Sequence, residues 1–157
     1  MGTPEDPPIL CLEGTIDASL EAMSEVHRLI AEFWQQLARV PVVQPDATWR
    51  ALFESATAEI AGNIVRHAYT NPSSTRHFHL SLCCYHDSVV ATTLDEGMAL
   101  DPLALIGTPN MDITLEDEAL DGGWGLPIAQ AATDGLDYQR LASGQNQWRI
   151  DKHFVKR

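Results

Sequence analysis

The chain has 157 residues, 45% of them hydrophobic, and a formal net charge of −12. This length corresponds to one domain with a packed core, and the acidic excess excludes a general binder of nucleic acid or anionic membranes. No apolar run could span a membrane and the N-terminus lacks the basic start of a signal peptide, so we expect a cytoplasmic protein. The three cysteines cannot all pair, and reduced thiols are the simplest expectation.

The first half of the chain predicts a strand followed by two helices. Residues 1–8 are rich in proline and are expected to form a flexible tail, with a single domain over residues 9–157. A strand over 9–16 precedes a helix that Asp17 or Ser19 could cap and that ends at Pro41. A second helix begins after Asp46 and presents one apolar face for about five turns, as far as Ala68.

The second half predicts four strands and one short helix. Residues 78–84 and 88–94 alternate as a hairpin, residues 95–125 form a long loop rich in Gly, Pro and Asp, and residues 127–133 form a helix. Strands over 136–142 and 147–154 follow, joined by a turn over 143–146. Two hairpins predict an α+β, two-layer α/β sandwich with a mixed, mostly antiparallel sheet and helices on one face. They disfavour a doubly wound parallel sheet, which needs a helix between successive strands.

The second helix carries a row of polar residues at the edge of its apolar face. Glu59, Asn63 and His67 are spaced by four, so they lie along one side of the helix. A carboxylate and an amide oxygen one turn apart could act as a base and as a ligand of Mg²⁺. Taken alone, the pattern is also that of an ordinary amphipathic helix.

Two further motifs follow. Asp95 and Gly97 end a β-branched run, where a carboxylate could accept a hydrogen bond from the amino group of a base such as adenine. A glycine-rich stretch then leads into the short helix; its members are Gly122, Gly123, Trp124, Gly125 and Leu126. Backbone N–H groups at such a helix start can bind phosphate. Alone, each motif is also typical of a turn or a linker.

The charge distribution makes backbone donors important for any phosphate ligand. No Lys or Arg occurs between Arg76 and Arg140, whereas acidic residues are frequent there. We therefore expect a phosphate bound in this region to depend on a metal ion and on N–H groups.

In this order and at these distances, the three motifs resemble the GHKL-type ATPase module, the Bergerat fold shared with gyrase and histidine kinases. The His67-Ala-Tyr ending, the short chain and the Asp137-Tyr-Gln-Arg and Gln147-Trp-Arg-Ile segments resemble the anti-sigma-factor serine/threonine kinases of bacterial partner-switching systems. The resemblance extends from about residue 9 to residue 154.

The resemblance implies ATP and Mg²⁺ as cofactors. Glu59 matches the general base, Asn63 the magnesium ligand and Asp95 the carboxylate that recognises adenine. The positions that match the nucleotide-binding residues are His67, Gly97, Gly122, Gly123, Trp124, Gly125 and Leu126, and residues 102–121 match a lid. The implied partners are a STAS-domain anti-sigma antagonist, phosphorylated on Ser or Thr, and a sigma factor, with a homodimer possible.

Two departures from the family pattern leave an alternative open. Ala99 replaces a glycine, and Pro127 takes a position usually held by a helix former. A non-catalytic ATP-binding module that sequesters a protein partner would tolerate both changes. A third hypothesis is a zinc site, whose candidate ligands are His77, His79, Cys83, Cys84 and His86.

Overall fold

A five-stranded antiparallel sheet forms one layer of the protein. The computed structural model describes residues 6–19, 21–42, 44–70, 77–97 and 125–154, and for residues 67–70 it describes the backbone alone. The strands are β1 (Leu10–Asp17), β2 (His77–Cys84), β3 (Ser88–Asp95), β4 (Gly135–Arg140) and β5 (Asn146–His153). Their order across the sheet is β1-β2-β3-β5-β4, and every neighbouring pair is antiparallel.

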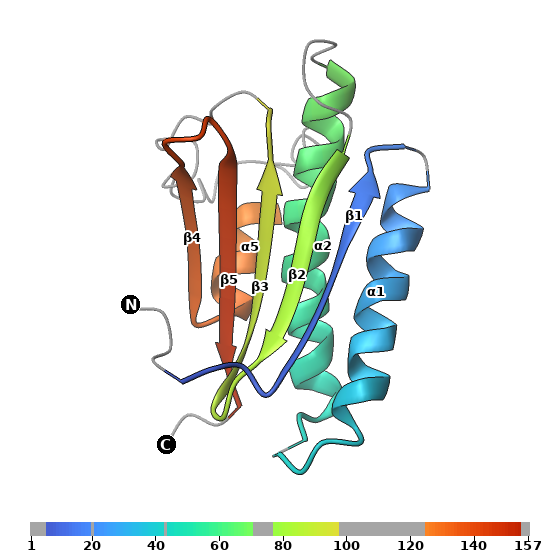
Figure 1. The fold of residues 1–157 in the computed structure, drawn as a ribbon, viewed down its shortest axis with the longest axis vertical. Helices are drawn as coiled ribbons and strands as arrows, with labels where there is room; N and C mark the ends of the chain where they lie inside the picture. Colours follow the sequence, from blue (N-terminus) through green and yellow to red (C-terminus); the bar gives the residue numbers. More distant parts are fainter. Residues whose placement is uncertain (1–5, 20, 43, 71–76, 98–124, 155–157) are drawn as a thin grey trace, which may run out of the picture.

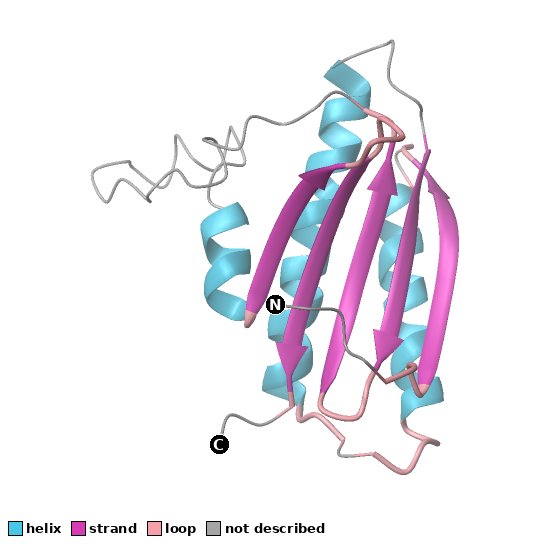
Figure 2. Cartoon of the chain, turned by 60° about the vertical axis from the view of Figure 1, so that its left-hand side comes forward, coloured by secondary structure: helices cyan, strands magenta, loops and turns pink. Residues whose placement is uncertain are grey.

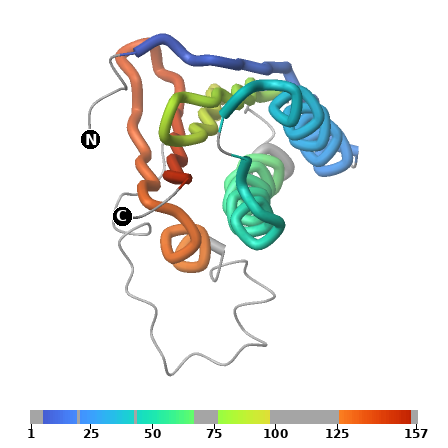
Figure 3. Tube along the Cα trace, turned by 90° about the horizontal axis from the view of Figure 1, so that it is seen from below, coloured from blue at the N-terminus to red at the C-terminus, as the bar shows by residue number. Residues whose placement is uncertain are grey.

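Three helices form the second layer. They are α1 (Ala22–Leu37), α2 (Ala47–Thr70) and α5 (Gly125–Ala132), and all lie on the same face of the sheet (Figures 1 and 2). Viewed from below, α2 lies in the middle, with α1 and α5 on either side (Figure 3). The predicted α+β two-layer sandwich is therefore confirmed.

The core lies between these layers and follows from the predicted periodicities. Along β2, buried positions alternate with more exposed ones, because successive side chains of a strand point to opposite faces. The largest fully buried side chains are Trp148, Phe33, Phe53, Phe78, Ile30, Leu37, Ile60, Leu80, Leu82, Ile150, Val26 and Val89. They come from α1, from α2 and from strands β2, β3 and β5, so one continuous core joins the layers.

The helix starts differ in part from expectation. Asp46 caps α2, since its Oδ1 accepts a hydrogen bond from the backbone N of Trp49 at 2.8 Å. At α1 the N-cap position is Glu21, not Asp17 or Ser19, and it makes no side-chain capping bond. Ser19 instead binds within the preceding turn, where its Oγ accepts from the N–H of Glu21 at 3.3 Å.

Several predictions fall outside the described residues. These are the first five residues of the tail, the stop of the second helix at Asn71, and most of the long loop, including the lid over 102–121. In the part of the chain that is described, no helix is long and apolar enough to cross a membrane.

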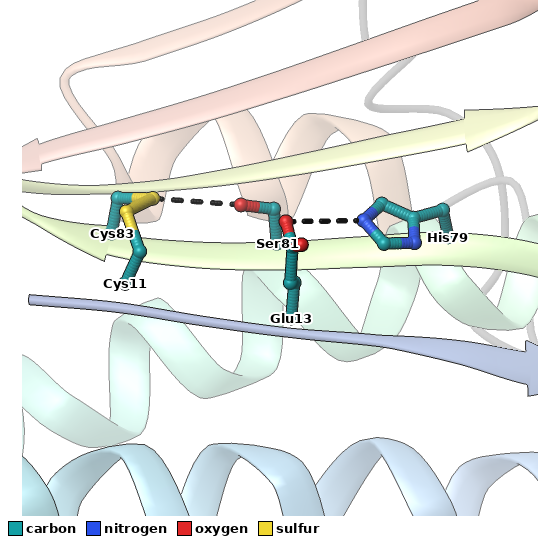
Figure 4. Close-up of a disulfide and its surroundings, with 5 residues drawn as sticks. All are labelled: Cys11, Glu13, His79, Ser81 and Cys83. Carbon is teal, nitrogen blue, oxygen red and sulfur yellow. Dashed lines mark hydrogen bonds and ion pairs between the residues drawn. A yellow bond between two sulfur atoms is a disulfide. The ribbon is translucent and has the colours of Figure 1, made fainter.

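The prediction of reduced thiols is wrong for two of the three cysteines. Cys11 on β1 and Cys83 on β2 are directly opposite each other in the antiparallel register and form a disulfide with a Cα–Cα distance of 4.2 Å. Figure 4 shows the pair beside Glu13 and His79 on the face of the sheet away from the helices. The third cysteine, Cys84, points to the core.

The disulfide predicts a defined thiol count. We expect Ellman's reagent to detect one thiol, that of Cys84, in unfolded non-reduced protein and three after reduction. Because the crosslink spans 72 residues, the chain-entropy model assigns it about 4 kcal/mol of stability. Reduction should therefore lower the urea midpoint, and a Cys11→Ser variant should already unfold at the reduced value. Three thiols before reduction would contradict the pairing.

The burial of Cys84 predicts that the folded protein loses stability at alkaline pH. Desolvation raises the pKa of its thiol from 9.0 to about 11, because burial disfavours the thiolate. Between these pH values the unfolded chain releases the proton and the folded chain retains it, so stability falls as pH rises from about 9 to 11. Urea unfolding of wild type should show a steeper decline over this range than unfolding of Cys84→Ala. Equal slopes would contradict the prediction.

Candidate nucleotide site

The polar edge of α2 faces away from α1. Glu54 marks the side of α2 next to α1, since its Oε1 accepts a hydrogen bond from Trp34 Nε1 of α1 at 2.5 Å. At 3.6 residues per turn, Glu59 and Asn63 lie about 140° and about 180° around the helix from Glu54. Both are half-buried, and the next residue along, Ile60 or Ile64, is buried. They therefore lie on the side of α2 that is flanked by α5 (Figure 3).

The amide of Asn63 has a charged neighbour that the sequence analysis missed. Its Oδ1 accepts a hydrogen bond from Nη2 of Arg66, one turn further along α2. Positions i and i+3 of a helix are adjacent, so this contact was readable from the sequence. The described backbone continues through His67, whose side chain is outside the described atoms.

Asp95 points to the helix-bearing face of the sheet. It lies at the last position of β3, directly opposite Phe78 of β2 and Asn146 of β5. Phe78 is 1% exposed and points into the core, and directly opposed residues of neighbouring strands share a face. The carboxylate oxygen Oδ1 accepts from the backbone N of Gly97 and from Asn146 Nδ2, both at 2.9 Å.

Two residues near the end of the chain complete this corner, and sequence analysis assigned neither to a site. Asn146 was placed in a turn, but it is the first residue of β5. Arg140 ends β4, and its Nη1 donates to the carbonyl of Gly97 at 2.6 Å and to Asn146 Oδ1 at 3.0 Å. The missed signal was the register of the second hairpin, which pairs Arg140 with Asn146.

The N-terminus of the short helix α5 is directed toward the same end of the molecule. It begins at Gly125, and Leu126 packs against the core. A two-residue connection joins α5 to β4, and β4 runs in the same direction as β3 because both are antiparallel to β5. The helix runs opposite to these two strands, so its N-terminus is directed toward the end of the sheet where β3 stops (Figures 1 and 2). The first N–H groups of a helix lack partners within the helix and carry partial positive charge. Gly122, Gly123 and Trp124 lie outside the described residues.

These elements give a corner with complementary polar groups. The second half of α2 leads to the end of the sheet at which β2 begins and β3 stops (Figure 1). Two carboxylates, an amide oxygen and a helix N-terminus thus lie on the helix-bearing side of the sheet, with Asp95 at that end and the N-terminus of α5 directed toward it. The set can accept hydrogen bonds from a base, donate to phosphate and offer oxygen ligands to a cation.

The third hypothesis, a zinc site, finds no support in the described residues. Cys83 is in the disulfide and Cys84 points to the opposite face of the sheet. Among the described residues, no group of three His, Cys, Asp or Glu side chains could hold a metal ion. His77 and His79 instead line a cavity of about 310 Å³, largely on the helix-free face, whose other lining residues are Thr15, Leu94, Asp95, Glu96 and Gln145.

Comparison with known protein families finds one match. A family model, the histidine kinase-like ATPase domain, matches residues 16–152. Among curated proteins, none matches the chain.

Two solved structures are similar in fold. One contains the RsbU and RsbW domains of Rv1364c from Mycobacterium tuberculosis, with a TM-score of 0.61 and 18% identity over 92% of this chain and 32% of that one. The other is the SiaB–SiaC complex from Pseudomonas aeruginosa, with a TM-score of 0.52 and 14% identity over 93% of this chain and 90% of the matched chain. This chain thus spans about a third of the matched mycobacterial chain.

Proposed function

Because the chain belongs to the histidine kinase-like ATPase domain family, we propose that it is an ATP- and Mg²⁺-dependent serine/threonine protein kinase and anti-sigma factor. Its substrate in this proposal is a STAS-domain anti-sigma antagonist. The observation that carries the proposal is the position of Asp95, anchored on the helix-bearing face at the end to which the second half of α2 leads and toward which the start of α5 is directed.

The first part of the proposal is recognition of ATP. Oδ1 of Asp95 already accepts two hydrogen bonds, while Oδ2 accepts none from the described residues. Oδ2 can therefore accept a hydrogen bond from the 6-amino group of adenine. The phosphates would lie toward the N-terminus of α5, with the remaining nucleotide contacts assigned to Gly97, Gly125, Leu126, His67, Gly122, Gly123 and Trp124.

The donor set on α2 suits magnesium. Mg²⁺ prefers oxygen ligands, and Asn63 Oδ1 is a neutral amide oxygen at the half-buried edge of the helix. Asn63 would hold the ion, which when bound neutralises phosphate charge. Arg66 now donates to the same oxygen and would have to give way.

The second part is phosphoryl transfer. The hydroxyl oxygen of a Ser or Thr attacks the γ-phosphorus of ATP. The bond between the γ-phosphorus and the β,γ-bridging oxygen breaks, and ADP leaves. Glu59 takes the hydroxyl proton, the role of a general base. Most of the acceleration in such reactions comes from positioning and charge neutralisation.

The third part is the protein partner. The net charge of −12 disfavours nucleic acid, so regulation by this chain would act through proteins. One structure of similar fold is a complex of two proteins, SiaB and SiaC. We propose that the unphosphorylated antagonist competes with a sigma factor for this chain, in the cytoplasm, with the chain acting as a homodimer.

A non-catalytic ATP-binding module remains the second candidate, and one of its two reasons is now weaker. Pro127 lies in the first turn of α5, where a backbone N–H is not needed and proline is well tolerated. The other reason, Ala99, lies outside the described residues. ATP binding without any transfer to a protein would select this candidate.

Substitution of Glu59 tests catalysis. We expect Glu59→Gln to bind ATP as wild type does and to transfer phosphate from [γ-³²P]ATP to STAS-domain proteins about 10²–10⁴-fold more slowly, since a general base contributes that much. Glu54→Gln is the matched control on the same helix, because its side-chain oxygen can still accept from Trp34. Equal transfer rates for the two variants would remove Glu59 from the mechanism, and no transfer by wild type would favour the second candidate.

Substitution of Asp95 tests base recognition. An amide at this position could turn a donor toward the donor of adenine, so we expect Asp95→Asn to weaken ATP binding about 10- to 100-fold, the worth of one hydrogen bond to a charged group. Asp137→Asn, exposed on the helix-free face of β4, is the control. Titration with a fluorescent ATP analogue measures both, and an unchanged affinity for Asp95→Asn would make Asp95 only a turn residue.

A further inference from the structure

Asn146 is a buried polar residue that makes several hydrogen bonds in the corner around Asp95. It is 2% exposed and lies at the start of β5, between the ends of two neighbouring strands. Its direct neighbours in the sheet are Asp95 of β3 and Arg140 of β4. A side chain buried to this degree needs hydrogen-bond partners, because an unpaired amide is costly in the interior.

The amide of Asn146 is used at both ends. Nδ2 donates to Asp95 Oδ1 at 2.9 Å and to the carbonyl of Gly97 at 3.2 Å. Oδ1 accepts from Arg140 Nη1 at 3.0 Å and from the hydroxyl of Tyr138. Only an amide has two donors and an acceptor in this arrangement, so neither Asp nor Leu at position 146 could replace it.

These bonds close a ring around Gly97, the last described residue before the long loop. Arg140 donates to the Gly97 carbonyl at 2.6 Å, and the Gly97 N–H donates to Asp95 Oδ1 at 2.9 Å. The backbone of residue 97 is thus fixed from both sides by side chains of β3, β4 and β5. The ring also fixes the rotation of the Asp95 carboxylate, because Oδ1 is held by two donors.

A second buried polar group lies on the same face, near this end of β3. Thr93 precedes Asp95 by two residues and therefore points to the same face. Its side chain is 1% exposed, and its hydroxyl has no partner among the described residues. Buried hydroxyl groups nearly always have partners.

We propose that Asn146 is a positioning residue for base selection: by holding Asp95 Oδ1, it directs Oδ2 toward the 6-amino group of a bound adenine. Arg140 supports this arrangement by holding Asn146 Oδ1 and the Gly97 carbonyl. This inference rests on the proposed binding of ATP and assigns to Asn146 a part in selecting adenine nucleotides.

Two ligands that differ only at the 6-amino group separate positioning from general support of the fold. Affinities for ATP and for purine riboside triphosphate, which lacks that group, are measured for wild type, Asn146→Ala, Asp95→Ala and the double variant. We expect Asn146→Ala to lose about tenfold in ATP affinity, with the second ligand bound as in wild type. The double variant should bind ATP no more weakly than Asp95→Ala, because both changes act through one carboxylate.

Gln147→Ala is the matched control. Gln147 is the next residue of β5 and accepts a hydrogen bond from Gln139 Nε2 of β4 at 2.6 Å, on the opposite face of the sheet. The Gln147→Ala substitution removes a similar hydrogen bond between the same two strands. It should leave the affinities for ATP and for purine riboside triphosphate unchanged.

The outcomes distinguish this inference from the proposed function. Wild type that binds neither ligand overturns the proposed function and the inference with it. Wild type that prefers ATP, with Asn146→Ala losing affinity equally for both ligands or for neither, overturns the inference alone. An additive double variant would also overturn it, since Asn146 would then act independently of Asp95.

Discussion

The antiparallel register between β3 and β5 is the constraint on which the site depends. It pairs Asp95 with Asn146, and two residues further into the sheet it pairs Thr93 with Trp148, which fills the core. A slip of one residue would turn every side chain of β5 to the other face of the sheet. Trp148 and Ile150 would then leave the core, so burial of these two side chains fixes the same register that aligns Asn146 with Asp95. Packing and recognition are set by one pairing.

Features that depend on local periodicity could be predicted from the sequence, whereas features that depend on strand pairing could not. Elements with a strong period, such as the buried stripe of α1 and the alternation of β2, required only local information. Glu59 and Asn63 share a helix, so their relation was also local. Asp95 was identified from the sequence as the acidic residue that ends a strand. Asn146, which holds its carboxylate, was not identified. Asn146 lies after a Ser-Gly-Gln sequence that is typical of a turn, and its contact with Asp95 depends on a pairing with a residue 51 positions away.

The disulfide was missed for the same physical reason. Cys11 and Cys83 are adjacent only because β1 pairs with β2 across 72 residues of chain. The bond lies on the helix-free face, whereas Asp95 and Asn146 point to the other face. It ties the edge strand β1 to the sheet without contributing a group to the site. The crosslink therefore stabilises the scaffold, and the chemistry of the site belongs to the opposite side.

The structure adds positive charge near the site that the linear order of residues did not indicate. The stretch without Lys or Arg suggested that phosphate could rely only on a metal ion and on backbone N–H groups. Two arginines from outside this stretch lie beside candidate site residues: Arg66 next to Asn63 on the same helix, and Arg140, which folding brings next to Gly97. Among the described residues, Arg140 donates to two neutral oxygens and forms no direct ion pair with a carboxylate. Charges attract over about 8–10 Å at physiological ionic strength. A nucleotide that approaches Gly97 would therefore meet the positive charge of Arg140 in an otherwise acidic protein, at a point held rigid by the bonds that orient Asp95.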